Sequence, residues 1–98
     1  MKQLKESDFS TELIILSKIY EYNYIKKKPI WYGRLKLCIR GKMTEGAMSR
    51  ALMKMGDLGL IDSEWEKIDK MWTRKFTIGW ECVDFAKNIY LKLKEIKK

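Results

Sequence analysis

The chain has 98 residues, of which 46% are hydrophobic and 12% aromatic, a globular composition with enough length for one domain and its own core. Its 21 lysines and arginines outnumber its 13 acidic residues, and the net charge of +8 favours a polyanionic partner or an anionic surface. With two cysteines, no histidine and no Gly-rich phosphate loop, the sequence argues against a zinc site and against an enzyme, so we expect no catalytic residue, metal or cofactor.

The amino-terminal residues and the two cysteines indicate the cellular compartment of the protein. Residues 1–10 lack the apolar core of a signal peptide, and the longest uninterrupted aliphatic run, residues 13–16, is too short to cross a membrane. Cys38 and Cys82 lie far apart and are expected to be small buried apolar residues, with a disulfide as the alternative. We therefore expect a cytoplasmic protein.

The first helix is expected to begin near Ser10 or Thr11, where a hydroxyl group can cap it, and to run toward Ile25. Apolar residues occur nearly all round this helix, so it is either the central core helix or partly faces a partner subunit. Three tyrosines near its end are expected to pack with their hydroxyl groups in water: Tyr20, Tyr22 and Tyr24.

Residues 26–42 form a cationic segment without an acidic residue. Pro29 suits the first turn of a helix, which predicts a second helix over residues 30–39. A helix N-terminus beside three lysines is a candidate phosphate site, although the same residues also fit a solvated charge run. Trp31 and Tyr32 either pack or lie near the backbone of a bound duplex. The cations of the segment are Lys26, Lys27, Lys28, Arg34, Lys36, Arg40 and Lys42.

A third helix is predicted over residues 44–58, with Thr44 as its N-cap and Gly59 as its stop. One side is an apolar stripe at three- and four-residue spacing, formed by Met48, Ala51, Leu52, Met55 and Leu58. The rest of its surface carries Glu45, Gly46, Ser49, Arg50, Met53, Lys54 and Asp57. Small and hydrogen-bonding side chains on an exposed helix face are suited to reading a DNA groove.

Two strands are predicted next, over residues 60–67 and 72–78, joined by residues 68–71. Trp65 is expected to pack and to lock this hairpin onto the helices. Period-two alternation places three acids on the opposite strand face, where a solvated surface is favoured over a cation site: Asp62, Glu64 and Glu66. The tip and its flanks carry Lys67, Lys70, Arg74 and Lys75, which can reach a phosphate or a minor groove.

The last helix is predicted over residues 80–98. Its apolar residues step by four and three, as in a coiled-coil seam, and we expect them to form a dimer interface: Cys82, Ala86, Ile89, Leu93 and Ile96. Two heptads are short for a coiled coil, and the alternative is that the same stripe packs on its own domain. Val83 and Tyr90 widen the stripe, which suits contact with both its own domain and a partner chain.

The order helix–helix–helix–strand–strand–helix resembles that of the winged-helix transcription regulators, especially the PadR-like and MarR-like groups. The resemblance is carried by residues 49–55, SRALMKM, and by residues 58–65, LGLIDSEW, which look like the GLIESEW opening of a PadR-type wing. Residues 74–78, RKFTI, look like the returning strand. The resemblance covers roughly residues 11–90, and Gly79 and Cys82 stand where the family usually has Thr and Gly.

The resemblance implies an α+β, mostly α, winged helix-turn-helix in a single domain over residues 1–98. Residues 11–78 would be the DNA-binding core and residues 80–98 the dimerisation helix. It implies a homodimeric, sequence-specific, double-stranded DNA-binding transcription regulator. The helix at 44–58 would enter the major groove, and the wing at 60–78 would lie on the adjacent backbone or minor groove.

The residues that would contact base edges are Glu45, Gly46, Ser49 and Arg50. The residues that would contact phosphates are Lys28, Lys54, Lys70, Arg74 and Lys75. The alternative is a winged-helix module for protein–protein contacts within a larger complex, because one scaffold hosts unrelated functions. The acid-free cationic segment at 26–42 favours DNA, whereas the nearly neutral third helix keeps the alternative open.

Overall fold

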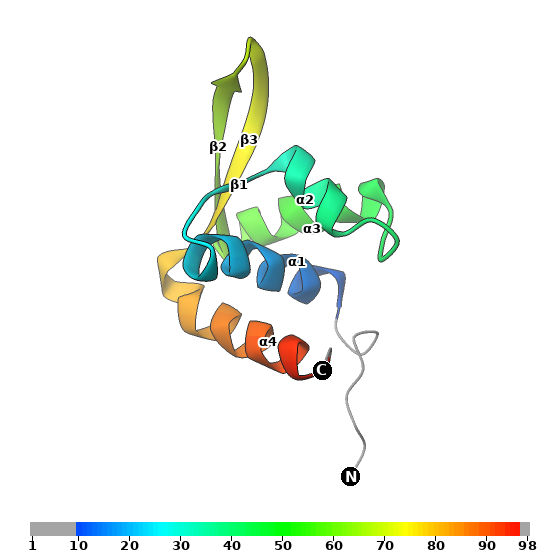
Figure 1. Cartoon of the computed structure of the whole chain (residues 1–98), viewed down its shortest axis with the longest axis vertical. Coiled ribbons are helices and arrows are strands. Elements are labelled where there is room, and N and C mark those ends of the chain that lie inside the picture. The colour runs from blue at the N-terminus through cyan, green and yellow to red at the C-terminus, as the bar shows by residue number, and fades with distance from the viewer. Residues whose placement is uncertain (1–9, 97–98) are drawn as a thin grey trace.

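The first helix forms the centre of the molecule. The computed structural model describes residues 10–96, and in it α1 (Thr11–Tyr20) lies between α4 (Val83–Ile96) on one side and α3 (Glu45–Asp57) on the other (Figure 1). Ser10 caps α1 by accepting a hydrogen bond from the Leu13 amide at 3.3 Å. Because its neighbours cover both sides, α1 is the central core helix, and the chain continues from it into the short π-helix η2 (Glu21–Ile25).

A two-residue strand replaces the start of the predicted second helix. β1 (Ile30–Trp31) pairs antiparallel with β3 (Met71–Ile78), in the register Ile30↔Phe76 and Trp31↔Lys75, and α2 (Tyr32–Cys38) begins only after it. The prediction of a helix from residue 30 is therefore wrong. The physical reason is that β3 would otherwise present a free edge at its base, and the wholly buried Ile30 side chain packs beside Phe76 when the chain is extended.

The third helix is confirmed, with Thr44 as its N-cap and Gly59 as its stop. The Thr44 hydroxyl accepts a hydrogen bond from the Ala47 amide at 3.1 Å. At the other end Gly59 has φ +77°, and the amides of Gly59 and Leu60 donate to Gly56 and Met55, which is a Schellman motif. Leu58 was expected in the buried stripe and is 64% exposed, because the helix ends before it and the chain turns away there.

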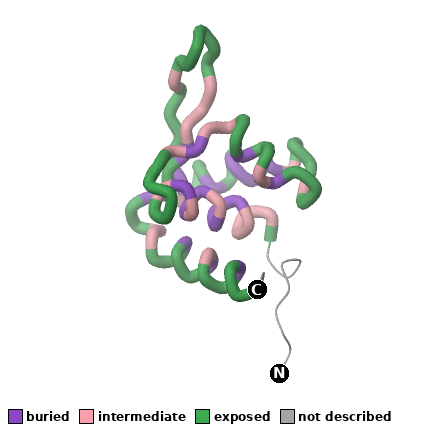
Figure 2. The backbone as a smooth tube through the Cα atoms, viewed as in Figure 1, coloured by how far each residue is buried: buried purple, intermediate pink, exposed green. Residues whose placement is uncertain are grey.

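The hairpin consists of β2 (Ile61–Ile68) and β3, in a sheet of order β1-β3-β2. Asp69 and Lys70 form a two-residue turn with φ of +49° and +70°, tighter than the four-residue connection that was predicted. Only the base of the hairpin is buried, and its outer half projects beyond the helices (Figures 1 and 2). Trp65 lies on the projecting part and is 66% exposed, so the prediction that it locks the hairpin to the helices is wrong.

The last helix begins with a 3-10 turn, η3 (Trp80–Cys82), and continues as α4. Ala86, Ile89 and Leu93 are at most 8% exposed within a single chain, and α4 packs against α1. Within one chain this apolar surface packs on its own domain, which is the alternative that the sequence left open, and the dimer interface remains a prediction. Cys82 and Ile96, at the ends of the stripe, remain partly exposed.

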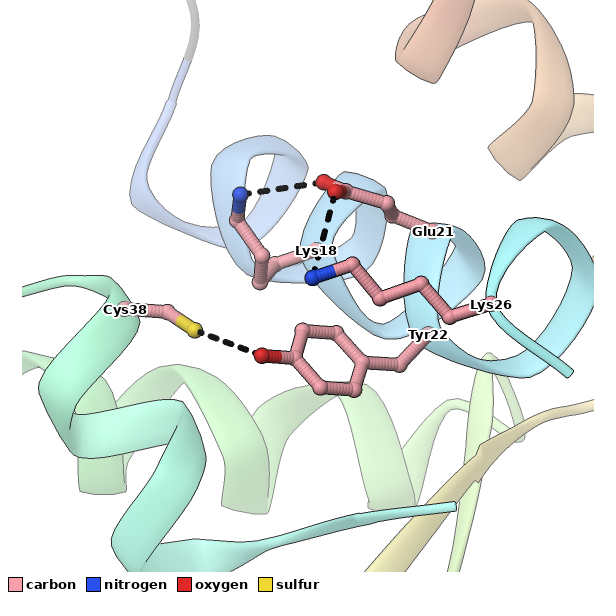
Figure 3. A network of polar contacts seen from close by, with 5 residues as sticks. All are labelled: Lys18, Glu21, Tyr22, Lys26 and Cys38. Atoms are coloured by element: carbon pink, nitrogen blue, oxygen red, sulfur yellow. Dashed lines mark hydrogen bonds and ion pairs between the residues drawn. The ribbon is translucent and has the colours of Figure 1, made fainter. Parts of the chain in front are cut away.

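Both cysteines are partly buried free thiols, so neither the expected full burial nor the alternative disulfide is found. The Cys38 thiol donates to the Tyr22 hydroxyl at 3.7 Å and joins the end of α2 to η2 (Figure 3). Burial and this contact raise the pKa of the Tyr22 hydroxyl. Beside it, Lys26 lies 4.4 Å from the centre of the Tyr22 ring, and Glu21 pairs with Lys18 at 3.0 Å and with Lys26 at 3.9 Å.

Among residues 10–96, no helix is both long enough and apolar enough to span a membrane.

Candidate nucleic-acid interface

The outward side of α3 is formed by the residues that alternate with its buried stripe. Met48, Leu52 and Met55 are at most 3% exposed, whereas Arg50 is exposed and Ser49 is partly exposed. Among the described residues, the Arg50 guanidinium has neither a hydrogen-bond partner nor an ion-pair partner. Its five N–H donors are therefore free to meet a ligand, and a bidentate fork of this kind matches the acceptor pair of guanine.

Glu45 and Gly46 begin the same side of α3. A methyl group added at Gly46 would come no closer than 3.9 Å to another group, the guanidinium of Arg50, so the surface here is low and open. The Glu45 carboxylate is already engaged, because it accepts hydrogen bonds from Lys36 at 3.0 Å and from the Tyr32 hydroxyl at 2.8 Å. These two donors hold the pKa of the Glu45 carboxyl below its usual value of 4.5. The carboxylate is thus ionised at neutral pH, with Lys36 balancing its charge.

The two faces of the projecting hairpin carry opposite charges. Cross-strand pairing places Trp65 opposite Arg74 and Lys67 opposite Trp72 on one face. The reverse face carries all three acids of β2, and Lys75 lies between Glu64 and Glu66 at 3.8 Å from each. Glu66 also accepts a hydrogen bond from the Trp31 indole at 3.1 Å, which ties the reverse face to β1. The first of these faces is cationic and aromatic, and we call it the wing face.

The five residues predicted to contact phosphates are distributed over different parts of the surface. Lys70 lies at the exposed hairpin tip, and Arg74 lies on the wing face. Lys75 is on the reverse face with its two glutamates. Lys54 pairs at 3.7 Å with Glu12 of α1, and Lys28 lies 5.6 Å from the centre of the Tyr22 ring. The structure therefore brings only Arg74 directly beside the outward side of α3.

A hollow of about 380 Å³ joins the outward side of α3 to the wing face, and we call it the wing hollow. Tyr32 and Ser49 both line it, and their hydroxyl oxygens lie 3.1 Å apart. The residues that line it are Tyr32, Ser49, Trp65, Trp72, Thr73 and Arg74. Of these, the two tryptophans were not singled out as site residues from the sequence. The signal that could have found them is their period-two placement on the face that carries Lys67 and Arg74.

No family model and no curated protein matches the sequence. Among solved structures, the chain is similar to the circadian clock associated protein Pex from Anabaena, with a TM-score of 0.68. The match covers 89% of this chain and 79% of that chain at 13% sequence identity. No family model or sequence match supports the narrower resemblance to PadR-like and MarR-like regulators. What the architecture and this likeness show is the fold, a mostly helical α+β winged helix.

Proposed function

We propose that this protein binds double-stranded DNA and regulates transcription, with α3 in the major groove and the hairpin as a wing beside it. The observation that carries the proposal is the continuity of one surface. Ser49 of α3 and Arg74 of the wing line the same hollow, and Arg50 stands next to them without an intramolecular partner. The major groove of B-DNA, about 12 Å wide, admits a helix whose outer side chains are small or hydrogen-bonding.

In this proposal the outward side of α3 reads the sequence. Arg50 donates two parallel hydrogen bonds to a guanine, and Ser49 bonds a neighbouring base edge. Gly46 keeps the first turn of α3 low, so that the backbone approaches closely. Glu45 accepts from a cytosine amino group, for which its carboxylate must exchange one of its present donors, Lys36 or Tyr32.

Phosphate contacts position the protein without specifying sequence. Arg74 and Lys70 are the principal candidates, because Arg74 lines the same hollow as Ser49 of α3 and Lys70 lies at the tip of the wing. Lys28, Lys54 and Lys75 are further candidates, each of which already has a neighbour within the chain. The cationic segment at 26–42 adds attraction at longer range, which salt weakens.

We propose that two copies act together as a homodimer on half-sites about one helical turn apart. Within one chain the stripe of α4 packs on its own domain, and other residues of this helix remain exposed. Phe85 and Leu91 are 48% and 44% exposed on α4, and Cys82 and Ile96 are partly exposed at its ends. These residues are the candidates for contact with the second copy.

The test is to select bound sequences from a random pool of duplexes and then to compare Arg50 variants. We expect Arg50→Ala to lose about 1–3 kcal/mol on the selected duplex and much less on an unrelated duplex. Arg50→Lys is the matched control, because it keeps the charge but not the bidentate geometry, and it should lose preference nearly as fully. If no sequence is enriched and no duplex is bound, a winged-helix module for protein contacts is the better account.

A further inference from the structure

The wing face carries two tryptophans whose side chains are mostly exposed. Trp65 and Trp72 are 66% and 64% exposed, although large aromatic side chains are mostly covered in folded proteins. In the part of the chain that the structure describes, Trp72 makes no hydrogen bond, ring stacking or cation–π contact. Both indoles line the wing hollow. Uncovered aromatic surface of this kind marks an interaction site.

The charges around the two indoles are all positive on their own face. Arg74 lies 5.7 Å from the centre of the Trp65 ring, and Lys67 is the cross-strand partner of Trp72. The acids of β2 are on the reverse face, where Lys75 pairs with two of them. Glu45 contacts Tyr32, which lines the hollow, and its charge is balanced by Lys36. The face therefore suits an anionic partner that also offers flat apolar rings.

The two tryptophans are neighbours on the wing face. Trp65 is opposite Arg74, and Trp72 is two residues before Arg74, so the two tryptophans are diagonal neighbours across the strands. Diagonal positions on antiparallel strands are within reach of aromatic side chains, so one ligand in the hollow can meet both indoles. Tyr32 also lines the hollow, and its hydroxyl group can hydrogen-bond a base edge.

We propose that the wing hollow receives an unpaired nucleobase of DNA whose duplex part lies on α3. This inference rests on the proposed function, since α3 must hold the duplex beside the wing. A paired base in a duplex is stacked on both sides and cannot offer its faces to an indole. An unpaired base at an overhang or a junction can, and stacking on aromatic side chains accepts any base because every base has a π-face. The protein would thus prefer duplex DNA with an adjoining single strand over blunt duplex.

The experiment compares a blunt duplex with the same duplex carrying a short oligothymidine overhang. The protein carries Trp31→Phe and Trp80→Phe, so that its fluorescence reports on the wing tryptophans alone. We expect the overhang to raise affinity at least about fivefold and to quench the fluorescence, as base stacking on an indole does. Trp72→Ala and Trp65→Ala should each remove most of the gain, while Trp72→Tyr should keep part of it.

The matched control is Trp80→Ala, because Trp80 is 82% exposed on η3 and does not line the hollow. Introduced in place of Trp80→Phe, it should leave both affinities unchanged. Equal affinity for the two duplexes without quenching would overturn the inference and leave the proposed function standing. The same conclusion would follow if the overhang still raised the affinity of Trp72→Ala. Failure to bind either duplex would instead overturn the proposed function. A further outcome is that the single oligothymidine strand, without a duplex, quenches the fluorescence and that Trp72→Ala abolishes this quenching. That result would support the hollow as a base site and count against the proposal that α3 holds a duplex beside it.

Discussion

The hydroxyl oxygens of Tyr32 and Ser49 lie 3.1 Å apart, and this contact fastens the first turn of α2 to the outward side of α3. The Tyr32 hydroxyl also donates to Glu45 one turn earlier on α3, at 2.8 Å. One side chain thus orients two of the residues proposed to meet DNA bases. Lys36 joins the same network through Glu45, so a change at α2 is expected to affect the outward side of α3.

The pKa of Glu45 tests this network. We expect its carboxyl group to titrate below 4.5, and Lys36→Met to move the midpoint upward because the strongest donor is lost. A depressed pKa in the folded state stabilises the protein above the unfolded value and loses that contribution as pH falls through the folded value. The measurement is a carboxyl-carbon titration by NMR, with Lys87→Met as the control. A wild-type midpoint at or above 4.5 would show that the network does not form.

The orientation of α3 can be tested with two methionines of the same helix. Met55 is wholly buried and Met53 is 67% exposed. We expect Met55→Ala to lower the free energy of unfolding by about 2–5 kcal/mol, since it leaves a cavity in the core. Met53→Ala should change it by less than about 0.5 kcal/mol. Urea unfolding followed by circular dichroism measures both, and similar losses for the two variants would mean that α3 is rotated from the orientation described.

Gly79 is required by the close approach of another part of the backbone. A methyl group there would lie 2.5 Å from the Gly59 carbonyl oxygen and 3.2 Å from that of Leu60. We expect Gly79→Ala to destabilise the fold by about 1–3 kcal/mol, because backbone must move. The matched control is Gly56→Ala in α3, where a methyl group meets nothing within 4 Å and should stabilise by up to about 1 kcal/mol. A neutral Gly79→Ala in thermal unfolding would contradict the packing of η3 against the end of α3.

The burial of the α4 stripe within one chain predicts that its contribution to stability does not depend on protein concentration. Leu93 is 6% exposed on its own domain, so Leu93→Ala should cost about 2–5 kcal/mol whatever the protein concentration. If the stripe were instead a seam between two chains, the loss would depend on concentration, because association is coupled to stability by mass action. The measurement is the free energy of unfolding at several protein concentrations, with sedimentation to follow the oligomeric state. A loss that changes with concentration would contradict packing within one chain.

The sequence was sufficient to predict those elements whose signals come from residues close together in the chain. Helical spacing of Met48, Leu52 and Met55 gives the buried side of α3, and Thr44 and Gly59 give its ends, because caps and stops are fixed by a few neighbouring residues. The alternation of β3 likewise gives the two faces of the hairpin.

What the sequence could not give depends on contacts between distant segments. β1 is only two residues long, and its partner Phe76 lies far along the chain, so no local pattern distinguishes it from a helix start. Alternation shows which face carries Trp65, but not that its side chain remains 66% exposed. For the same reason the wing hollow, which unites residues from three elements, could not be predicted.

The salt dependence of duplex binding tests the central claim most directly. Fluorescence anisotropy with a labelled duplex would give the dissociation constant between about 50 and 200 mM salt. If the five proposed cations of each protomer contact phosphates, the logarithm of the affinity should fall against the logarithm of salt with a slope, per bound protomer, of about −4 to −5. Arg74→Ala should reduce that slope by about one, and Lys87→Ala, on the outer side of α4, should not. A flat response, or no binding at low salt, would contradict a DNA-binding role for this surface.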